Sequence, residues 1–238
     1  MNKYLTISAV ALMGMCVSVP AYAEDPEPAV SMSVGADVVS SYLWRGQECG
    51  GFSVQPSFAL SFNKAHLSLE AWASAELFTT GDILNMTEFD LTLSWNPVEP
   101  LTVALADFYF VGGDYFGRWN FGSNATHWLE GSLSYDFGPL ALAWNTVLTG
   151  NDYRANGNRA YSTYAELTVP WKLSEVEGSL AVGALLWDDA FTTGGSEGFK
   201  VCNVALTANK ELFHLPFMGQ IVANPMSDRV YFIVGLTF

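Results

Sequence analysis

Acidic side chains are the residues of this sequence with the clearest capacity for chemistry, because they recur on the polar parity of segments whose other parity is apolar. The positions concerned are Asp37, Glu70, Glu88, Asp90, Glu130 and Glu166. Carboxylates that line one inner surface attract cations. Bases at matching positions are few, chiefly Arg45, Lys200 and Arg229. The sequence therefore predicts an acidic inner surface with a weak preference for cations, lined by the six acids together with Arg45 and Arg229.

Metal-binding and nucleophilic chemistry finds little support among the other side chains. The histidines His66, His127 and His214 stand apart, and Cys49 and Cys202 are the cysteines beyond residue 23. Two thiols and isolated imidazoles do not make a four-ligand zinc site, so we expect no metal and no cofactor. A lipid-modifying hydrolase would need a serine beside a histidine. No such pair accompanies His127 at a telling spacing, so we expect no enzyme; whether Cys49 and Cys202 form a disulfide stays open.

Composition narrows the class of protein. Half of the residues are hydrophobic (50%) and only 14% are charged, whereas a soluble domain usually carries about a quarter charged residues. No run approaches the ~18 consecutive apolar residues of a membrane-spanning helix, so the apolar residues are dispersed by alternation. The net charge of −14 argues against nucleic acid as a partner, because nucleic-acid binding needs a basic surface.

The first residues have the pattern of a secretory signal. Lys3 precedes an apolar stretch, and Ala21-Tyr22-Ala23 offers the small-x-small site that signal peptidase cleaves. We expect removal of residues 1–23, a short periplasmic leader over residues 24–30 and one folded unit over residues 31–238.

A lipid anchor at Cys16 is the alternative fate of this segment. That modification prefers a small residue before the cysteine, and Met15 stands there instead. We therefore favour cleavage after Ala23.

The elements that must position the acids are strands, because apolar and polar residues alternate with a period of two from residue 31 onward. The twelve expected strands span about 31–45, 52–62, 66–77, 88–95, 101–110, 127–137, 140–149, 161–169, 178–187, 199–209, 215–224 and 229–238. In the fifth, Asp107 shares its parity with apolar residues, which suggests a bulge or the start of a rim.

The connections between these strands sort into two classes. Those after even-numbered strands are mostly short, whereas those after odd-numbered strands are often longer and rich in Gly, Asn and Asp, as in 78–85, 111–126, 150–160 and 188–198. Exceptions are the short connections at 47–51 and 225–228 and a longer one near 210–214. An even strand number with this ordering predicts an all-β, transmembrane, antiparallel up-and-down barrel with both termini in the periplasm.

Three features favour a membrane barrel over a soluble one. Charged residues occupy the middle of the polar parity, and the final strand carries Val230, Phe232, Val234, Leu236 and Phe238 on one parity. Aromatic residues gather at strand ends, where rings would lie at headgroup depth. These residues are Tyr42, Trp44, Trp95, Tyr135, Phe137, Trp171 and Trp187.

The segment Ser40-Ser41-Tyr42-Leu43-Trp44-Arg45-Gly46, followed by Gln55-Pro56-Ser57-Phe58, resembles the opening of the TorF-like outer-membrane porin family. Asp107-Phe108-Tyr109, Thr149-Gly150-Asn151-Asp152 and Asn224-Pro225 are similar to that family too. The resemblance implies a porin-type barrel in the outer membrane and leaves its solute unassigned. The aromatic end of the last strand resembles the signal by which periplasmic chaperones and the barrel-assembly machinery recognise their clients.

Several functions remain open at this point. The barrel could conduct small solutes, with bulky lumen side chains such as Trp72, Tyr164 and Tyr231 narrowing it, or its acids could pair with bases and hydroxyls to form a plug. It could also serve adhesion or envelope structure through its loops. The loop over residues 111–126 could fold inward as a constriction or pack against the rim. The residues that would form this constriction are Asp114, Tyr115, Arg118 and Trp119.

Overall fold

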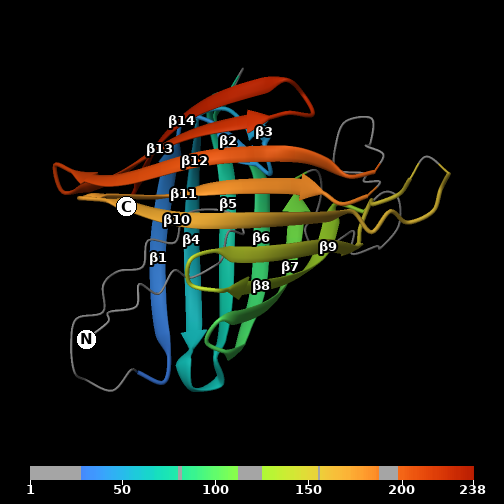
Figure 1. Ribbon diagram of the computed structural model, residues 1–238, viewed down its shortest axis with the longest axis horizontal. Coiled ribbons are helices and arrows are strands. Elements are labelled where there is room, and N and C mark those ends of the chain that lie inside the picture. Colours follow the sequence, from blue (N-terminus) through green and yellow to red (C-terminus); the bar gives the residue numbers. More distant parts are fainter. Residues whose placement is uncertain (1–27, 80–81, 112–124, 155, 188–197) are drawn as a thin grey trace.

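The alternating segments pair into one antiparallel sheet that closes on itself (Figure 1). In this computed structural model the described residues are 28–79, 82–111, 125–154, 156–187 and 198–238. The expected signal and most of the expected leader therefore lie outside the described residues. Within the described ranges the helical element is a 3-10 turn at Asn63–Ala65, and no helix there is long and apolar enough to cross a membrane.

Twelve strands form the closed barrel, as the alternation predicts. They are β1 (Ser31–Val39), β4 (Ser53–Phe62), β5 (Leu67–Thr79), β6 (Asp82–Val98), β7 (Leu101–Phe110), β8 (His127–Asp136), β9 (Ala141–Thr149), β10 (Thr163–Leu173), β11 (Val176–Leu185), β12 (Lys200–Leu212), β13 (Leu215–Asn224) and β14 (Arg229–Thr237). Consecutive strands are neighbours throughout, and β14 pairs with β1. The predicted all-β, antiparallel up-and-down barrel is confirmed.

The barrel closes where the last strand meets the first. Asp37 lies opposite Thr237 in the register, and the backbones of Ala36 and Phe238 exchange two hydrogen bonds, 2.9 and 3.2 Å long. A closed barrel leaves no edge strand, because every strand then has two neighbours.

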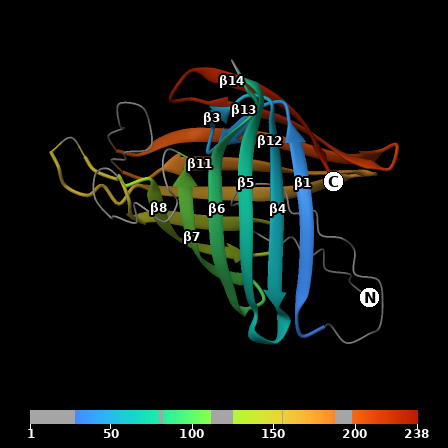
Figure 2. The same cartoon turned by 180° about the vertical axis from the view of Figure 1, so that it is seen from behind.

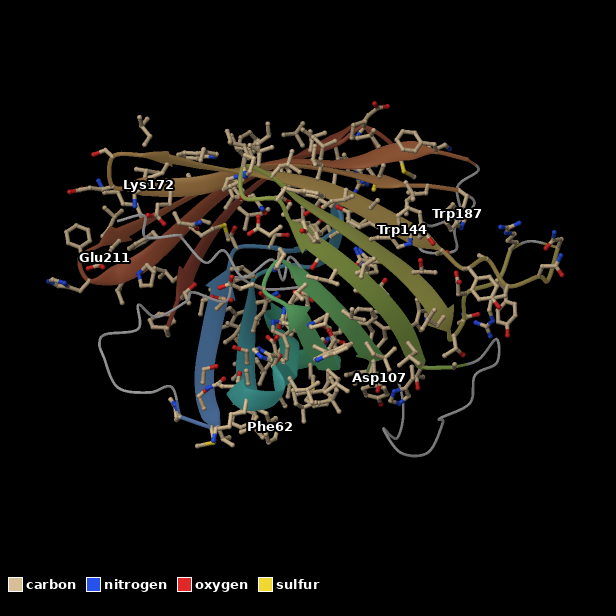
Figure 3. All side chains as sticks on the ribbon, turned by 60° about the horizontal axis from the view of Figure 1, so that its bottom comes forward. Phe62, Asp107, Trp144, Lys172, Trp187 and Glu211 are labelled. Atoms are coloured by element: carbon tan, nitrogen blue, oxygen red, sulfur yellow. The ribbon has the colours of Figure 1, made fainter. Side chains whose placement is uncertain are left out.

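Two walls with crossing strand directions give the barrel a flattened form. In Figures 1 and 2, β4, β5 and β6 run nearly at right angles to β10, β11 and β12. We call the end with the turns at 63–65, 99–100, 137–140, 174–175 and 213–214 the short-turn rim, and the other end the long-loop rim. Lys172 and Glu211 lie at the first, and Asp107 and Trp187 lie toward the second (Figure 3).

Side chains separate by kind between the two surfaces of the sheet. Large apolar side chains point outward and are exposed on every wall, for example Val34, Leu93, Leu133, Leu167 and Phe232. The inward parity carries the buried polar residues, among them Ser74, Glu88, Asp90, Glu130, Asn145 and Asn203. The protein is therefore apolar outside and largely polar inside, the reverse of a soluble barrel.

The predicted first strand, 31–45, is wrong at its end. β1 stops at Val39, and β2 (Tyr42–Trp44) pairs with β3 (Gln47–Gly50) in a separate two-stranded sheet. Tyr42 and Trp44 thus leave the outward parity, and their assignment to the aromatic belt is wrong. Of the remaining belt residues, Trp95, Tyr135 and Phe137 are exposed on the outward parity, whereas Trp171 and Trp187 are half-buried.

Two expected long connections are mostly strand. β5 and β6 stay in register as far as Thr79 and Asp82, so most of 78–85 belongs to the ladder. Likewise Leu212 pairs with Leu215, which reduces the expected connection near 210–214 to a tight turn. Apolar residues continue into both segments, at Ile83 and Leu84 in the first and at Leu212 and Leu215 in the second, which favours strand over loop.

Candidate functional site: a hairpin inside the barrel

The β2–β3 hairpin lies inside the barrel, because its residues contact inner walls on several sides (Figure 2). Its turn is Arg45-Gly46, and both residues have positive φ angles, 51° and 78°. Two central residues with positive φ define the type I′ turn, which matches the right-handed twist of a hairpin. The turn delivers the Arg45 side chain into the lumen.

An apolar patch on the lumen wall holds one side of the hairpin. Val39, Ala181, Ala205, Val222 and Ile233 form a buried cluster contributed by β1, β11, β12, β13 and β14. Leu43, in the middle of β2, packs against this cluster. Burying a leucine side chain contributes about 1.5–3 kcal/mol, which favours the inward position of the hairpin over an extended loop.

A buried ion pair holds the other side. Nη1 and Nη2 of Arg45 donate to Oε2 and Oε1 of Glu130 on β8, at 2.8 and 2.6 Å. The Glu130 side chain is fully buried and that of Arg45 is 7% exposed. The guanidinium also lies over the rings of Trp44 and Tyr164, 4.4 and 4.7 Å from their centroids. A planar cation between two aromatic faces gains from both, so Arg45 is anchored in three ways.

Tyr42 ties the hairpin to β6. Its hydroxyl donates to Oε2 of Glu88 at 2.9 Å, and its ring lies 5.4 Å from that of Trp72. Burial and the nearby carboxylate of Glu88 hold the pKa of the Tyr42 phenol well above its usual value, so the hydroxyl remains a donor. On the neighbouring wall Trp44 meets Phe108 edge-on at 6.0 Å. The long-loop half of the lumen is thereby filled.

Gly46 lies directly against the backbone of β12. Nδ2 of Asn224 donates to the Gly46 carbonyl at 2.9 Å, and a Cβ atom on Gly46 would lie 2.0 Å from the carbonyl oxygen of Cys202. Only glycine fits this contact, which fixes how deep the turn inserts.

We predict that Gly46→Ala lowers stability more than Gly138→Ala does. Both glycines have positive φ (78° and 89°), but a Cβ on Gly138 would meet nothing within 4 Å. Each substitution costs about 1–2 kcal/mol for the left-handed backbone, and Gly46→Ala adds roughly 1–3 kcal/mol for the clash. Urea unfolding in phospholipid vesicles measures both, and equal losses would contradict the inserted position of the turn.

The predicted lining acids all occupy the inward parity, but most are already partnered. Oδ1 of Asp37 accepts from Thr237, and Glu166 accepts from Tyr164, Thr168 and Asn203. Glu88 and Glu130 meet the hairpin, as described above. This pairing with hydroxyls and with one base is the arrangement that the plug alternative expects.

Three further predicted residues lie on barrel strands. Asp90 is buried on β6 in register with Trp72, and Glu70 lies on β5 in register with Thr92. Arg229 begins β14 and is exposed at the long-loop rim. The predicted constriction residues Asp114, Tyr115, Arg118 and Trp119 lie outside the described residues. Cys49 is exposed, Cys202 is buried, and no disulfide joins them.

A histidine–aspartate pair on the outward parity of β7 and β8 was not predicted from the sequence. Nδ1 of His127 lies 3.0 Å from each carboxylate oxygen of Asp107, and the Tyr109 ring lies 4.8 Å from the imidazole. All three side chains are buried although they share the outward parity of β7 and β8. The suspected bulge at Asp107 is wrong, because the β7–β8 register runs without a shift from Leu101 to Tyr109. An aspartate is tolerated at this otherwise apolar position because His127 on the neighbouring strand is its hydrogen-bond partner.

Below the hairpin a cavity of about 340 Å³ extends toward the short-turn rim. Its lining comes from the hairpin and from the inward residues of β1, β4, β5 and β10–β14. The geometry thus combines a filled half and a hollow, polar half in one lumen. No protein-family model matches this chain, and no curated protein shows significant sequence similarity to it.

Proposed function

We propose that the chain is an outer-membrane channel for slow, passive diffusion of small solutes, in which the β2–β3 hairpin is the constriction. The observation that carries the proposal is the inverted barrel, apolar outside and polar inside, with a hollow half-lumen that ends at the hairpin. The motif resemblance to TorF-like porins supports the same assignment. The proposal gives the chain no catalytic role.

The proposed orientation places the short-turn rim in the periplasm and the long-loop rim outside the cell. Outer-membrane barrels commonly have short periplasmic turns and longer extracellular loops. Both chain termini then lie in the periplasm, where chaperones and the assembly machinery would meet the last strand. The exposed outward residues would contact membrane lipid, which stabilises them only in a bilayer or detergent.

A weak cation preference accompanies the proposed pathway. Asp37 and Glu166 line the cavity with neutral donors as their hydrogen-bond partners, whereas the charge of Arg45 is matched by Glu130. The cavity wall is therefore acidic on balance. Carboxylates along a narrow pathway favour cations over anions.

Replacement of residues 41–51 by a short Gly-Ser linker tests the proposal. Because the hairpin fills the long-loop half of the lumen, we expect the shortened protein to show at least several-fold higher single-channel conductance than the wild type in planar bilayers. Reversal potentials in a salt gradient should show a modest preference for cations. The absence of channels in the shortened barrel, verified as folded by its gel mobility before and after heating, would overturn the proposal.

A non-conducting structural barrel is the second candidate. It is favoured by the buried Arg45–Glu130 pair, which stabilises the hairpin in the closed position. The same bilayer experiment separates the two functions. A wild-type protein without channels, together with a conducting shortened variant, would indicate a stably plugged barrel.

A further inference from the structure

The cavity below the hairpin has the size of a binding site for a small molecule. Its volume is about 340 Å³, near the lower end of the ~300–1,000 Å³ range of ligand sites. The hairpin residues Tyr42, Trp44 and Arg45 contribute to its lining, so a bound molecule would lie against the constriction. Any solute that enters this half of the lumen therefore meets this surface.

The polar lining is mostly neutral. Amide and hydroxyl side chains from β4, β10, β12 and β13 line the cavity. They are Gln55, Thr168, Asn203, Thr207, Asn209 and Gln220. Such groups both donate and accept hydrogen bonds, as the hydroxyl groups of a sugar also do. A neutral, multiply hydroxylated molecule can exchange its hydrogen bonds with water for bonds to this lining.

The charged lining disfavours anions and gives no concentrated site for a cation. Both terminal nitrogens of the Arg45 guanidinium already donate to the carboxylate of Glu130. Asp37 is on β1 and Glu166 on β10, five strands apart along the barrel order, and each carboxylate already accepts from neutral donors. Separate, partly satisfied carboxylates accept further bonds from hydroxyl groups without requiring a full charge on the ligand.

Aromatic residues give the cavity an apolar part. Trp72, Trp44 and Tyr164 line it beside the amide and hydroxyl side chains. The indole N–H of Trp72 is itself enclosed by protein atoms, so a ligand can reach the ring of Trp72 and not its N–H. The C–H face of a sugar ring can pack against aromatic carbon of this kind.

We infer that the cavity binds a neutral polyhydroxylated solute of the size of a monosaccharide or disaccharide, which packs against Trp72 and exchanges hydrogen bonds with the amide and hydroxyl side chains. This inference rests on the proposed channel, because it names the class of solute that the same lumen recognises. It adds a saturable site next to the constriction.

Isothermal titration of the full-length protein in detergent tests the inference, with glucose, maltose, choline and acetate as probes. We expect saturable binding of at least one sugar, with a dissociation constant on the order of millimolar, and none of acetate. Trp72→Leu removes the aromatic ring from the lining, so it should weaken sugar binding roughly 3- to 10-fold.

Trp171→Leu is the matched control. Trp171 lies on β10 at the outward parity and is not among the residues that line the cavity, so loss of its ring should leave sugar affinity unchanged. No saturable sugar binding, equal effects of the two variants, or tighter binding of choline would each overturn the inference. None of these outcomes depends on whether solutes pass through the barrel. The conductance of the barrel with residues 41–51 replaced therefore tests the channel proposal separately.

Discussion

Arg45→Met is expected to lower the free energy of unfolding by about 3–5 kcal/mol and to raise the conductance of the protein. The substitution leaves the carboxylate of Glu130, which is fully buried on β8, without its bidentate partner. It also removes the cation between the rings of Trp44 and Tyr164. Because Arg45 already has a positive φ of 51°, Met brings little additional backbone strain.

The double variant Arg45→Met with Glu130→Leu separates lost pairing from lost packing. A buried ion pair that is replaced by apolar residues of similar volume is often neutral for stability. We therefore expect the double variant to regain most of the stability that the single variant loses. The measurements are urea unfolding in phospholipid vesicles and single-channel recording. A single variant as stable as the wild type, with unchanged conductance, would contradict the anchoring role of Arg45.

The barrel itself was predictable because lipid and lumen impose opposite requirements on alternate residues. Along β6, Phe89, Leu91 and Leu93 alternate with Glu88, Asp90 and Thr92, and no other regular structure explains that order. The inward parity of the six predicted acids follows from the same rule. Their partners did not follow, because alternation assigns a surface and says nothing about which strands face each other across the lumen.

The inserted hairpin could not be predicted from alternation alone. β2 continues the parity of β1 with Tyr42 and Trp44, and its turn, Arg45-Gly46, lacks the Asn-Gly or Asp-Gly pair that usually signals a type I′ hairpin. The available signal was Ser40, a polar residue at an apolar position just after β1 ends. What determines the inward position is tertiary: Leu43 finds an apolar patch and Arg45 finds Glu130.

The Asp107–His127 pair was missed because its two residues lie on different strands. Asp107 lies among outward apolar residues, so the sequence suggested a bulge or the start of a rim. The register instead keeps Asp107 outward, two residues from the strand position opposite His127. Pairs on adjacent strands depend on register, and the sequence alone did not fix the register of β7 against β8.

His127→Leu is expected to destabilise the barrel by about 3 kcal/mol, because it leaves the buried Asp107 carboxylate on the outward parity without its imidazole partner. The midpoint temperature of the heat-induced shift in gel mobility measures this loss in detergent-solubilised protein.

The double variant Asp107→Leu with His127→Leu is the matched control, since Leu105 and Leu129 occupy adjacent outward positions on the same strands. Without a carboxylate to bury, this variant should unfold within a few degrees of the wild type. The pair would then be a structural element whose members need each other. The contrary outcome is a His127→Leu variant that keeps the wild-type midpoint but loses a phospholipid-hydrolysing activity of the wild-type protein. His127 would then be the general base of a hydrolase and Asp107 the residue that orients it, and the proposal that the protein has no catalytic role would be wrong.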